Sequence, residues 1–293
     1  MSILDELAAG VDLTGPVEEP LEVRFRGAHG NQIRGIDWGG NGPNCLFLHG
    51  GAMSAETWTL CSLLLRDRYR CVALDLRGHG ESDWCDDYTI AAQVDDIINV
   101  LAELGWSALH MTGMSLGGVV AAHVCARSLP QTINSLTLVD VAPGVSFGDV
   151  TRIRDFMSSE RVSQGPEGLS ELARRLGAQQ SDAELLYRYR SLARRLSDGA
   201  WTWKHDTRRP TDFGHILAHI EEMNELASHW TSPCLIVRGG RSRILSKRSA
   251  LAFSERCANG QTIEIDNAGH SVQEDNPVDL ANALAQFWEG IIR

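Results

Sequence analysis

The sequence predicts an α/β protein with a mainly parallel sheet that is covered by helices on both faces. Three observations support this fold class. Short apolar segments alternate with helix-like segments, a glycine-rich turn joins one apolar segment directly to a helix, and one long segment without strand patterns interrupts the alternation. Strands that alternate with helices at this spacing form parallel sheets, because each crossover helix packs back onto one face of the sheet.

Most of the expected strands are short apolar runs, which are typical of strands buried on both faces. The expected strands cover 21–26, 32–38, 45–48, 70–74, 108–111, 133–139, 234–238 and 262–265. Helices are expected at 54–65, 89–104, 116–127, near 214–229 and 246–257, and after Pro277. Ser54 and Thr89 begin two of these helices and are favoured N-cap residues.

The same patterns divide the chain into three parts. Residues 1–20 are acidic and are interrupted by proline and glycine, so we expect a loose N-terminal arm. Between residues 143 and 211, helix-period segments rich in Arg, Leu and Ala replace the alternating pattern. We therefore expect a core formed by 21–142 and 212–293, with a helical lid at 143–211 inserted after Asp140 and its strand.

Composition excludes several classes of partner. The chain of 293 residues is 43% hydrophobic and carries a net charge of −11, which argues against binding to nucleic acid. Seven cysteines without C-x-x-C spacing indicate neither a disulfide framework nor a zinc site. No targeting segment or membrane-length apolar run is present, so we expect a cytoplasmic protein that acts on a small molecule away from membranes. A homodimer is compatible with the sequence.

The most informative motif is the G-x-S-x-G pattern at 113–117, which lies between an expected strand and an expected helix. A sharp strand–helix turn of this kind exposes a serine as a nucleophile, and glycines on either side avoid clashes between the strand and the helix. The following helix N-terminus offers free N–H groups to a developing oxyanion. The motif predicts Ser115 as a nucleophile.

A nucleophilic serine needs a base from elsewhere in the fold. His270 follows the last expected strand in a loop, at the carboxyl edge of the sheet where open α/β sheets bind ligands. At the same edge, the Gly51 N–H can pair with the Leu116 N–H to form an oxyanion hole. His49 and His79 lie among glycines and are expected to brace their loops.

Together these segments resemble the α/β-hydrolase family over about residues 21–292. The resemblance rests on the His49-Gly50-Gly51 turn, the segment from Asp75 to Ser82, the Ser115 turn and the segment from Asn267 to His270, in this order. It implies Ser115 as nucleophile, His270 as base, Gly51 and Leu116 as oxyanion donors, and a cap domain after Asp140. The fold hosts many reactions, so the resemblance is less specific for activity.

The acid of the triad departs from a common pattern of the family. Relatives often carry an Asp in a segment that resembles 238–246, but Arg243 stands where that Asp is expected and no carboxylate occurs between Cys234 and Glu255. Asp140 ends the strand that precedes the lid, a position at which some relatives place the acid. We therefore expect Asp140 to orient His270.

Other carboxylates suit that role less well. Asp75 also ends a strand, but the resemblance implies a structural role for its loop. Glu274 and Asp275 lie too close to His270 along the chain, and Glu255 lies well along a helix.

No metal or cofactor is expected. His215 and His219 are spaced i, i+4, but the sequence shows neither an H-E-x-x-H glutamate nor a clear third ligand. The glycine-rich turns match neither a P-loop nor a G-x-G-x-x-G motif.

The charge distribution suggests that the substrate carries a carboxylate. Residues 151–210 have a balance of +4, whereas the rest of the chain carries −15. We expect Arg243 to bind a substrate carboxylate through its guanidinium group, and Trp201 and Trp203 to line an apolar part of the pocket. Paired arginines such as Arg174 and Arg175 are interpreted as ordinary solvated helix faces.

The sequence thus predicts a serine hydrolase of a small ester, lactone or amide that reacts through an acyl-enzyme. Hydrolysis of a C–C bond in a diketone-like compound is an alternative on the same residues. A cofactor-free dioxygenase that uses a His–Asp dyad, and a ligand-sensing receptor with little turnover, are alternatives from other classes.

Overall fold

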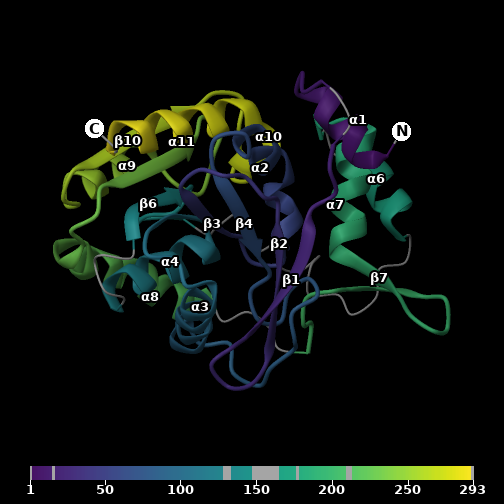
Figure 1. Ribbon diagram of the computed structural model, residues 1–293, viewed down its shortest axis with the longest axis horizontal. Helices are drawn as coiled ribbons and strands as arrows, with labels where there is room; N and C mark the ends of the chain where they lie inside the picture. The colour runs from purple at the N-terminus through teal and green to yellow at the C-terminus, as the bar shows by residue number, and fades with distance from the viewer. Residues whose placement is uncertain are drawn as a thin grey trace.

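The computed structural model describes residues 2–14, 17–127, 133–146, 165–175, 178–208 and 213–291. Within these residues an eight-stranded sheet forms the centre of the molecule, in the order β1-β2-β4-β3-β5-β6-β9-β10 (Figure 1). The first two pairs in this order, β1 with β2 and β2 with β4, are antiparallel, and all later pairs are parallel. The strands are β1 (Leu21–Arg26), β2 (Gln32–Asp37), β3 (Asn44–Leu48), β4 (Arg70–Leu74), β5 (Leu109–Met114), β6 (Ile133–Val139), β9 (Cys234–Gly239) and β10 (Gly260–Ile265).

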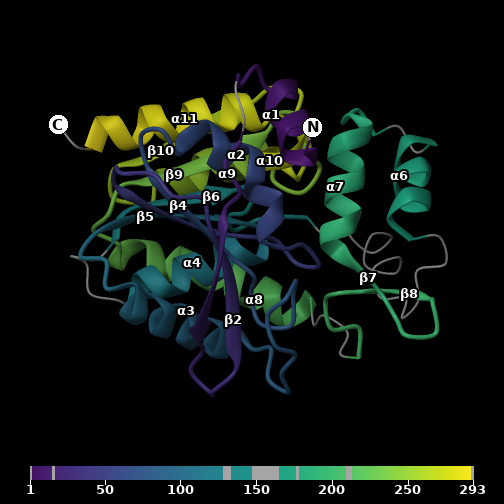
Figure 2. The ribbon, with the colours of Figure 1, turned by 45° about the vertical axis from the view of Figure 1, so that its right-hand side comes forward.

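Helices cover both faces of this sheet, as the alternating pattern predicts (Figure 2). The apolar core on one face contains residues of α3 (Ile90–Leu104), α4 (Leu116–Arg127), α8 (Phe213–Leu226) and α9 (Lys247–Ser254). The core on the other face contains residues of α1 (Ile3–Gly10), the 3-10 helix η1 (Ala55–Trp58), α2 (Thr59–Leu65), α10 (Val272–Asp275) and α11 (Pro277–Ile291). The predicted fold class is therefore confirmed.

Local signals set several boundaries. Thr89 accepts a hydrogen bond from the Ala92 N–H and caps α3, which ends at Gly105 in the left-handed conformation (φ 61°). The segment expected as one helix at 54–65 is divided into η1 and α2. A short 3-10 helix, η3 (Ala227–His229), completes the segment that follows α8.

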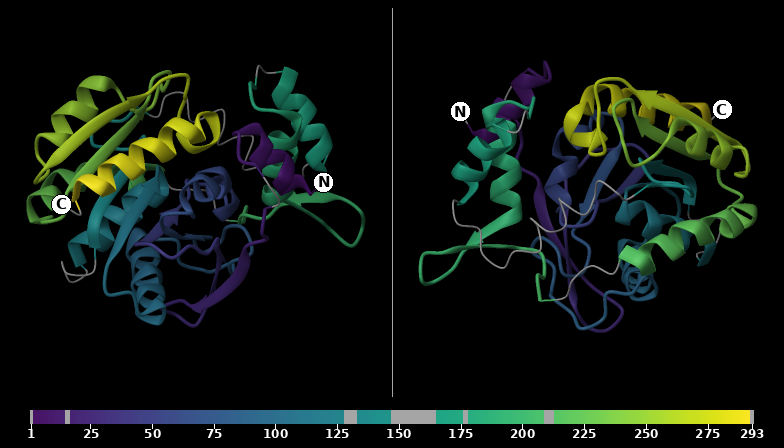
Figure 3. Two further views of the ribbon diagram at one scale, coloured as in Figure 1. Left: turned by 45° about the horizontal axis from the view of Figure 1, so that its top comes forward. Right: turned by 180° about the vertical axis from the view of Figure 1, so that it is seen from behind.

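The expectation of a loose N-terminal arm was wrong for residues 3–10, which form α1. Ser2 and Asp5 form a reciprocal capping box at its start. Leu4, Leu7 and Ala8 are buried because α1 packs against α2 and against α7 (Asp182–Leu192). Figure 3 shows α1, in purple, beside the teal helices of the cap. The composition of the segment does not reveal this apolar face, because acidic residues such as Asp5 and Glu6 lie between the buried ones.

The described part of the segment expected as a lid, called the cap below, lies beside the sheet (Figure 2), but the expectation of helices alone was wrong. The described part of the cap contains α6 (Gly165–Arg175), α7 and an antiparallel pair of short strands, β7 (Ala193–Arg195) and β8 (Trp201–Trp203). Lid residues 147–164, 176–177 and 209–211 lie outside the described residues. The cap is tied to the core by polar contacts, including one between the Ser54 and Ser191 hydroxyls at 3.2 Å.

None of the helices that the structure describes combines the length and the apolar character needed to span a bilayer.

Candidate active site

Ser115 lies at the turn between β5 and α4, and its backbone adopts an unusual left-handed conformation (φ 49°). Its N–H donates to the Val139 carbonyl of β6 at 3.1 Å. A Cβ at Gly113 would lie 2.3 Å from the Gly117 carbonyl oxygen, and one at Gly117 would lie 2.4 Å from the Leu48 carbonyl oxygen. Both glycines are therefore required by close backbone packing, and the turn holds a strained, half-buried serine.

His270 and Asp140 meet at the same edge of the sheet, although 130 residues separate them in the chain. The His270 Nδ1 lies 2.7 Å from the Asp140 Oδ2. A carboxylate accepts only, so this contact places the proton on Nδ1 and leaves Nε2 of the neutral ring as an acceptor. Among the described residues the Ser115 hydroxyl makes no hydrogen bond, and catalytic contacts of this kind are often loose without substrate.

Asp140 is fully buried and held in place by β9 and the loop that follows it. Its Oδ1 accepts from the Gly239 N–H at 3.1 Å, and its Oδ2 accepts from the Ser242 hydroxyl at 2.5 Å. Its own N–H donates to the Val237 carbonyl at 2.7 Å. The loop that lacks a carboxylate therefore supplies hydrogen-bond donors to the carboxylate of Asp140.

Sequence reasoning missed Gly239 and Ser242. Both lie in the segment 238–246, in which the resemblance leads one to look for an Asp rather than for a hydrogen-bond donor. A hydroxyl in that segment was a weak signal, because nothing in the sequence indicates which side chain it faces.

The loop that carries His270 packs directly on the end of β9. A Cβ at Gly239 would lie 2.0 Å from the Gly269 carbonyl oxygen, so only glycine allows this approach. The Arg241 N–H donates to the Ala268 carbonyl at 2.8 Å, and its guanidinium group donates to the Asn267 carbonyl. Arg241 therefore braces the histidine loop.

Gly51 and Leu116 are neighbours in space, although 65 residues separate them in the chain. A Cβ at Gly51 would lie 4.0 Å from the Leu116 Cδ2. Within the described residues neither amide donates a hydrogen bond. Free N–H groups at a helix N-terminus and an adjacent loop are suited to an anionic oxygen.

His49 braces the glycine-rich loop, as expected. Its Nδ1 donates to the Gly50 carbonyl at 2.7 Å and its Nε2 accepts from the Leu76 N–H at 3.0 Å. Complete burial lowers the pKa of His49 to about 4, so the ring is neutral near pH 7. His79 lies beside it, with the ring centroids 5.0 Å apart, and burial lowers its pKa as well.

The residues expected to bind substrate are less closely grouped. Arg243 is exposed in the loop after β9, next to Ser242. Trp203 is completely buried in a small cap cluster with Leu169 and Leu192, and the half-buried Trp201 packs against that cluster.

A cavity of about 50 Å³ lies between the cap and the core, at α7, η1 and α2. Neither Ser115 nor His270 lines it, and Arg243, Trp201 and Trp203 do not line it either. Its wall includes an ion pair that the sequence did not predict, between Arg188 of α7 and Glu274 at 3.1 Å.

The chain is similar to known hydrolases in both sequence and structure. Residues 43–277 match the family model of the alpha/beta hydrolase fold. The chain is 29% identical to the esterase Rv0045c of Mycobacterium tuberculosis over 300 residues, which cover 99% of this chain and 95% of the relative. A solved structure of that esterase has a TM-score of 0.78 at 27% identity and covers 98% of this chain and 97% of its own.

Two further proteins are similar. A probable protein phosphatase methylesterase 1 of Caenorhabditis elegans is 27% identical over 260 residues, which cover 85% of this chain and 70% of that protein. The structure of an E-2-(acetamidomethylene)succinate hydrolase has a TM-score of 0.77 at 20% identity, covers 92% of this chain and all of its own, and supports the fold alone. The chain belongs to the α/β-hydrolase fold family and is a hydrolase of ester bonds.

Proposed function

We propose that this esterase reacts through an acyl-enzyme formed on Ser115. The Ser115 Oγ attacks the ester carbonyl carbon while His270 Nε2 takes the hydroxyl proton. The C–O bond to the alcohol then breaks, and the alcohol leaves with the proton from His270. Water, deprotonated by the same nitrogen, attacks the acyl carbon and releases the carboxylic acid and Ser115.

The hydrogen bond of 2.7 Å between His270 Nδ1 and the buried Asp140 carboxylate carries this proposal. It fixes the tautomer whose Nε2 accepts a proton, and the carboxylate stabilises the imidazolium that forms during attack. The donors Gly239 and Ser242 support Asp140 as an anion, because each donates to one of its oxygens.

We propose that Gly51 and Leu116 stabilise the oxyanion. Their amides make no other hydrogen bond within the described residues. Leu116 follows Ser115 directly, and the loop of Gly51 packs on this turn, because a Cβ at Gly117 would lie 2.6 Å from the His49 carbonyl oxygen. Each such donor is worth about 3 kcal/mol in related oxyanion holes.

The proposed substrate is a small ester that carries a carboxylate. Arg243 supports a carboxylate, since it follows Ser242, which contacts the triad acid, in the loop at the carboxyl edge of the sheet. Trp201, which is half-buried, remains a proposed contact of the apolar part. Trp203 was expected there too, but it is completely buried against Leu169 and Leu192 and is therefore not proposed as a substrate contact. The two relatives named as esterases favour an ester over an amide.

The test uses pre-steady-state hydrolysis of short p-nitrophenyl esters. We expect a burst of nitrophenol equal to the enzyme concentration, and covalent labelling of Ser115 by a fluorophosphonate. Ser115→Ala should lower kcat by about 10⁵-fold or more and lose the label, because triad members act as a unit. Near-normal turnover by Ser115→Ala would contradict the acyl-enzyme.

A matched pair of substrates tests the substrate class. Arg243→Ala should raise KM at least about tenfold for a half-ester of a dicarboxylic acid, and leave the neutral methyl ester unchanged. Equal effects on both esters would contradict a carboxylate contact while leaving the acyl-enzyme intact.

A further inference from the structure

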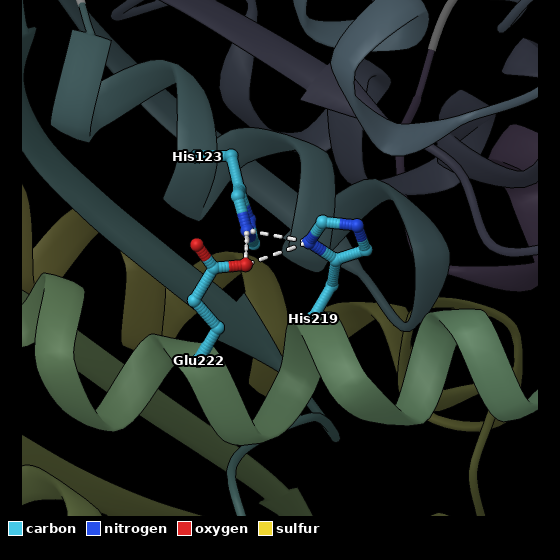
Figure 4. A group of neighbouring side chains, drawn as sticks. All are labelled: His123, His219 and Glu222. Atoms are coloured by element: carbon cyan, nitrogen blue, oxygen red, sulfur yellow. Dashed lines mark hydrogen bonds and ion pairs between the residues drawn. The ribbon is translucent and has the colours of Figure 1, made fainter.

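Three potential metal-ligand atoms converge on the outer side of the sheet, where α4 packs against α8. They are His123 Nε2 of α4, and His219 Nδ1 and Glu222 Oε2 of α8 (Figure 4). The sequence displayed only the pair His215 and His219, whereas the converging atoms belong to His219 and two other residues and not to His215. The third ligand comes from a helix 96 residues earlier in the chain, and Glu222 lies one turn beyond His219.

The spacing of these atoms fits one face of a metal tetrahedron. The two nitrogens lie 3.2 Å apart, and the carboxylate oxygen lies 2.8 Å from His219 Nδ1 and 3.3 Å from His123 Nε2. Ligands at about 2.0–2.1 Å from a tetrahedral zinc ion are separated from one another by roughly 3.3 Å. Two sides of the triangle already match this value, and the third needs only a small opening.

The tautomer of His123 also favours a cation. Its Nδ1 lies 2.9 Å from the Val119 carbonyl oxygen, which only accepts, so Nδ1 carries the proton. The lone pair on Nε2 of the neutral ring then points at the other two ligand atoms. Metal-binding histidines commonly donate their second N–H to a carbonyl in this way.

Hydrogen bonds alone do not satisfy the cluster when both rings are neutral. The single proton that His219 Nδ1 can offer serves the Glu222 oxygen at 2.8 Å. The contact of 3.3 Å between His123 Nε2 and the Glu222 oxygen then joins two acceptors without a proton. A cation in the centre satisfies all three atoms at once.

We propose that His123, His219 and Glu222 bind a divalent transition-metal ion of the zinc class. Two imidazoles and one carboxylate suit Zn²⁺, with Cu²⁺ and Ni²⁺ as competitors and Ca²⁺ or Mg²⁺ excluded by the nitrogen ligands. The side chains of His123 and His219 are 11% and 22% exposed, and that of Glu222 is 46% exposed, so water has access to the fourth position. The ring of His215 lies one turn before His219, with the centroids 4.6 Å apart.

Because the site lies between α4 and α8, a bound ion would link these two helices. The helix α4 starts at Leu116, directly after Ser115, and α8 is the first described element after the cap. An ion between His123 and His219 fastens these two helices together. We therefore expect it to raise the unfolding temperature of the whole chain, without a part in the chemistry at Ser115.

The test is a titration of chelator-treated protein with ZnCl₂ by calorimetry, together with Co²⁺ as an absorbing probe. We expect one ion per chain, the visible absorption bands of tetrahedral Co²⁺ with nitrogen ligands, and a higher unfolding temperature with Zn²⁺. His123→Ala and His219→Ala should each weaken Zn²⁺ binding at least about tenfold and abolish the Co²⁺ bands.

Two control variants make the result specific. His229→Ala removes an exposed histidine of η3 outside the cluster, and His270→Ala removes the proposed base. Both should bind Zn²⁺ as the wild type does, and the circular dichroism of every variant checks its fold. Equal Zn²⁺ affinity in His219→Ala and His229→Ala, or loss of the site in His270→Ala, would overturn the proposal.

Discussion

Two buried aspartates end parallel strands at the same edge of the sheet, and the structure uses them differently. Asp75 follows β4 and Asp140 follows β6, and both are completely shielded from solvent. Asp75 accepts from the Ala55 and Glu81 N–H groups at 2.7 and 2.9 Å and pairs with Arg34 at 3.2 Å. Its oxygens therefore bind two loops and a neighbouring strand.

Asp140 has the same chemical group and the same burial, but one of its oxygens faces a histidine. It accepts from Gly239 and Ser242 on one side and meets the His270 ring on the other. The partner that each carboxylate meets, rather than its burial or its place at a strand end, distinguishes the proposed triad acid Asp140 from Asp75, which braces loops. Four experiments can break or sharpen this distinction.

The largest expected effect is that of Asp140→Asn on turnover. An amide that donates to the ring stabilises the wrong tautomer of His270, so kcat should fall about 10⁴-fold. Because the amide keeps the shape of the carboxylate, the unfolding temperature should change little. Steady-state kinetics and thermal unfolding of the same preparation measure both quantities. A loss of turnover below tenfold would mean that Asp140 is not the triad acid.

The second experiment tests, at acidic pH, the hydrogen bond that His49 accepts from Leu76, the residue after Asp75. His49 must be neutral to accept from Leu76, and burial lowers its pKa to about 4, whereas an unfolded histidine has a pKa of about 6.5. Between these values the unfolded chain binds more protons, so the contribution of His49 to the free energy of unfolding is present above pH 6.5 and is lost as pH falls toward 4.

His49→Gln keeps an acceptor near the Nε2 position but does not titrate. Its deficit in unfolding free energy relative to the wild type should therefore shrink by about 3 kcal/mol between pH 7 and pH 4. Urea unfolding at both values measures it. A deficit that is independent of pH would show that His49 titrates alike in both states.

The third experiment applies the conservative change to the other aspartate. Asp75→Asn turns one of the accepting oxygens into a donor that faces Ala55, Glu81 or Arg34, which should cost about 1–3 kcal/mol of unfolding free energy. Turnover per folded molecule should stay within about tenfold of the wild type. Urea unfolding and active-site titration separate the two effects. Loss of turnover comparable to that of Asp140→Asn, in a folded protein, would remove the distinction.

The smallest expected effect is that of Ser242→Ala. Loss of one charge-assisted hydrogen bond leaves Asp140 with Gly239 and His270, so kcat should fall about tenfold while KM stays unchanged. Ser242→Thr retains the hydroxyl and serves as the control. If both variants lose the same activity, the packing of the side chain at position 242, rather than its hydrogen bond to Asp140, limits turnover.

The edge of the sheet at which Ser115, Asp140 and His270 lie was largely predictable because its signals are local. The Ser115 turn needs glycines within two residues, and each core strand is a short apolar run ended by turn residues. The strands 21–26, 70–74 and 133–139 and the helices that begin at Ile90 and Leu116 match their expected bounds. Strand order in a parallel sheet then brings Asp140 and His270 to one edge.

The features that the sequence did not predict depend on contacts between distant segments. Strands of three residues such as β7 and β8 are too short to show the alternation of apolar and polar residues that identifies a strand. They form because they pair with each other. The apolar face of α1 is buried only because α2 and α7 pack against it.

The side-chain contacts around Asp140, and those between His123, His219 and Glu222, also depend on segments that are distant in the chain. Sequence alone predicted that Ser115, His270 and a carboxylate lie at one edge of the sheet, because each follows an expected strand and the carboxyl ends of parallel strands meet at one edge. Only the tertiary structure decided that Ser242 holds that carboxylate and that His123 faces His219. Hydrogen bonds and metal-ligand geometry depend on distances of a few tenths of an ångström between side chains, which helix and sheet packing sets and residue patterns do not encode.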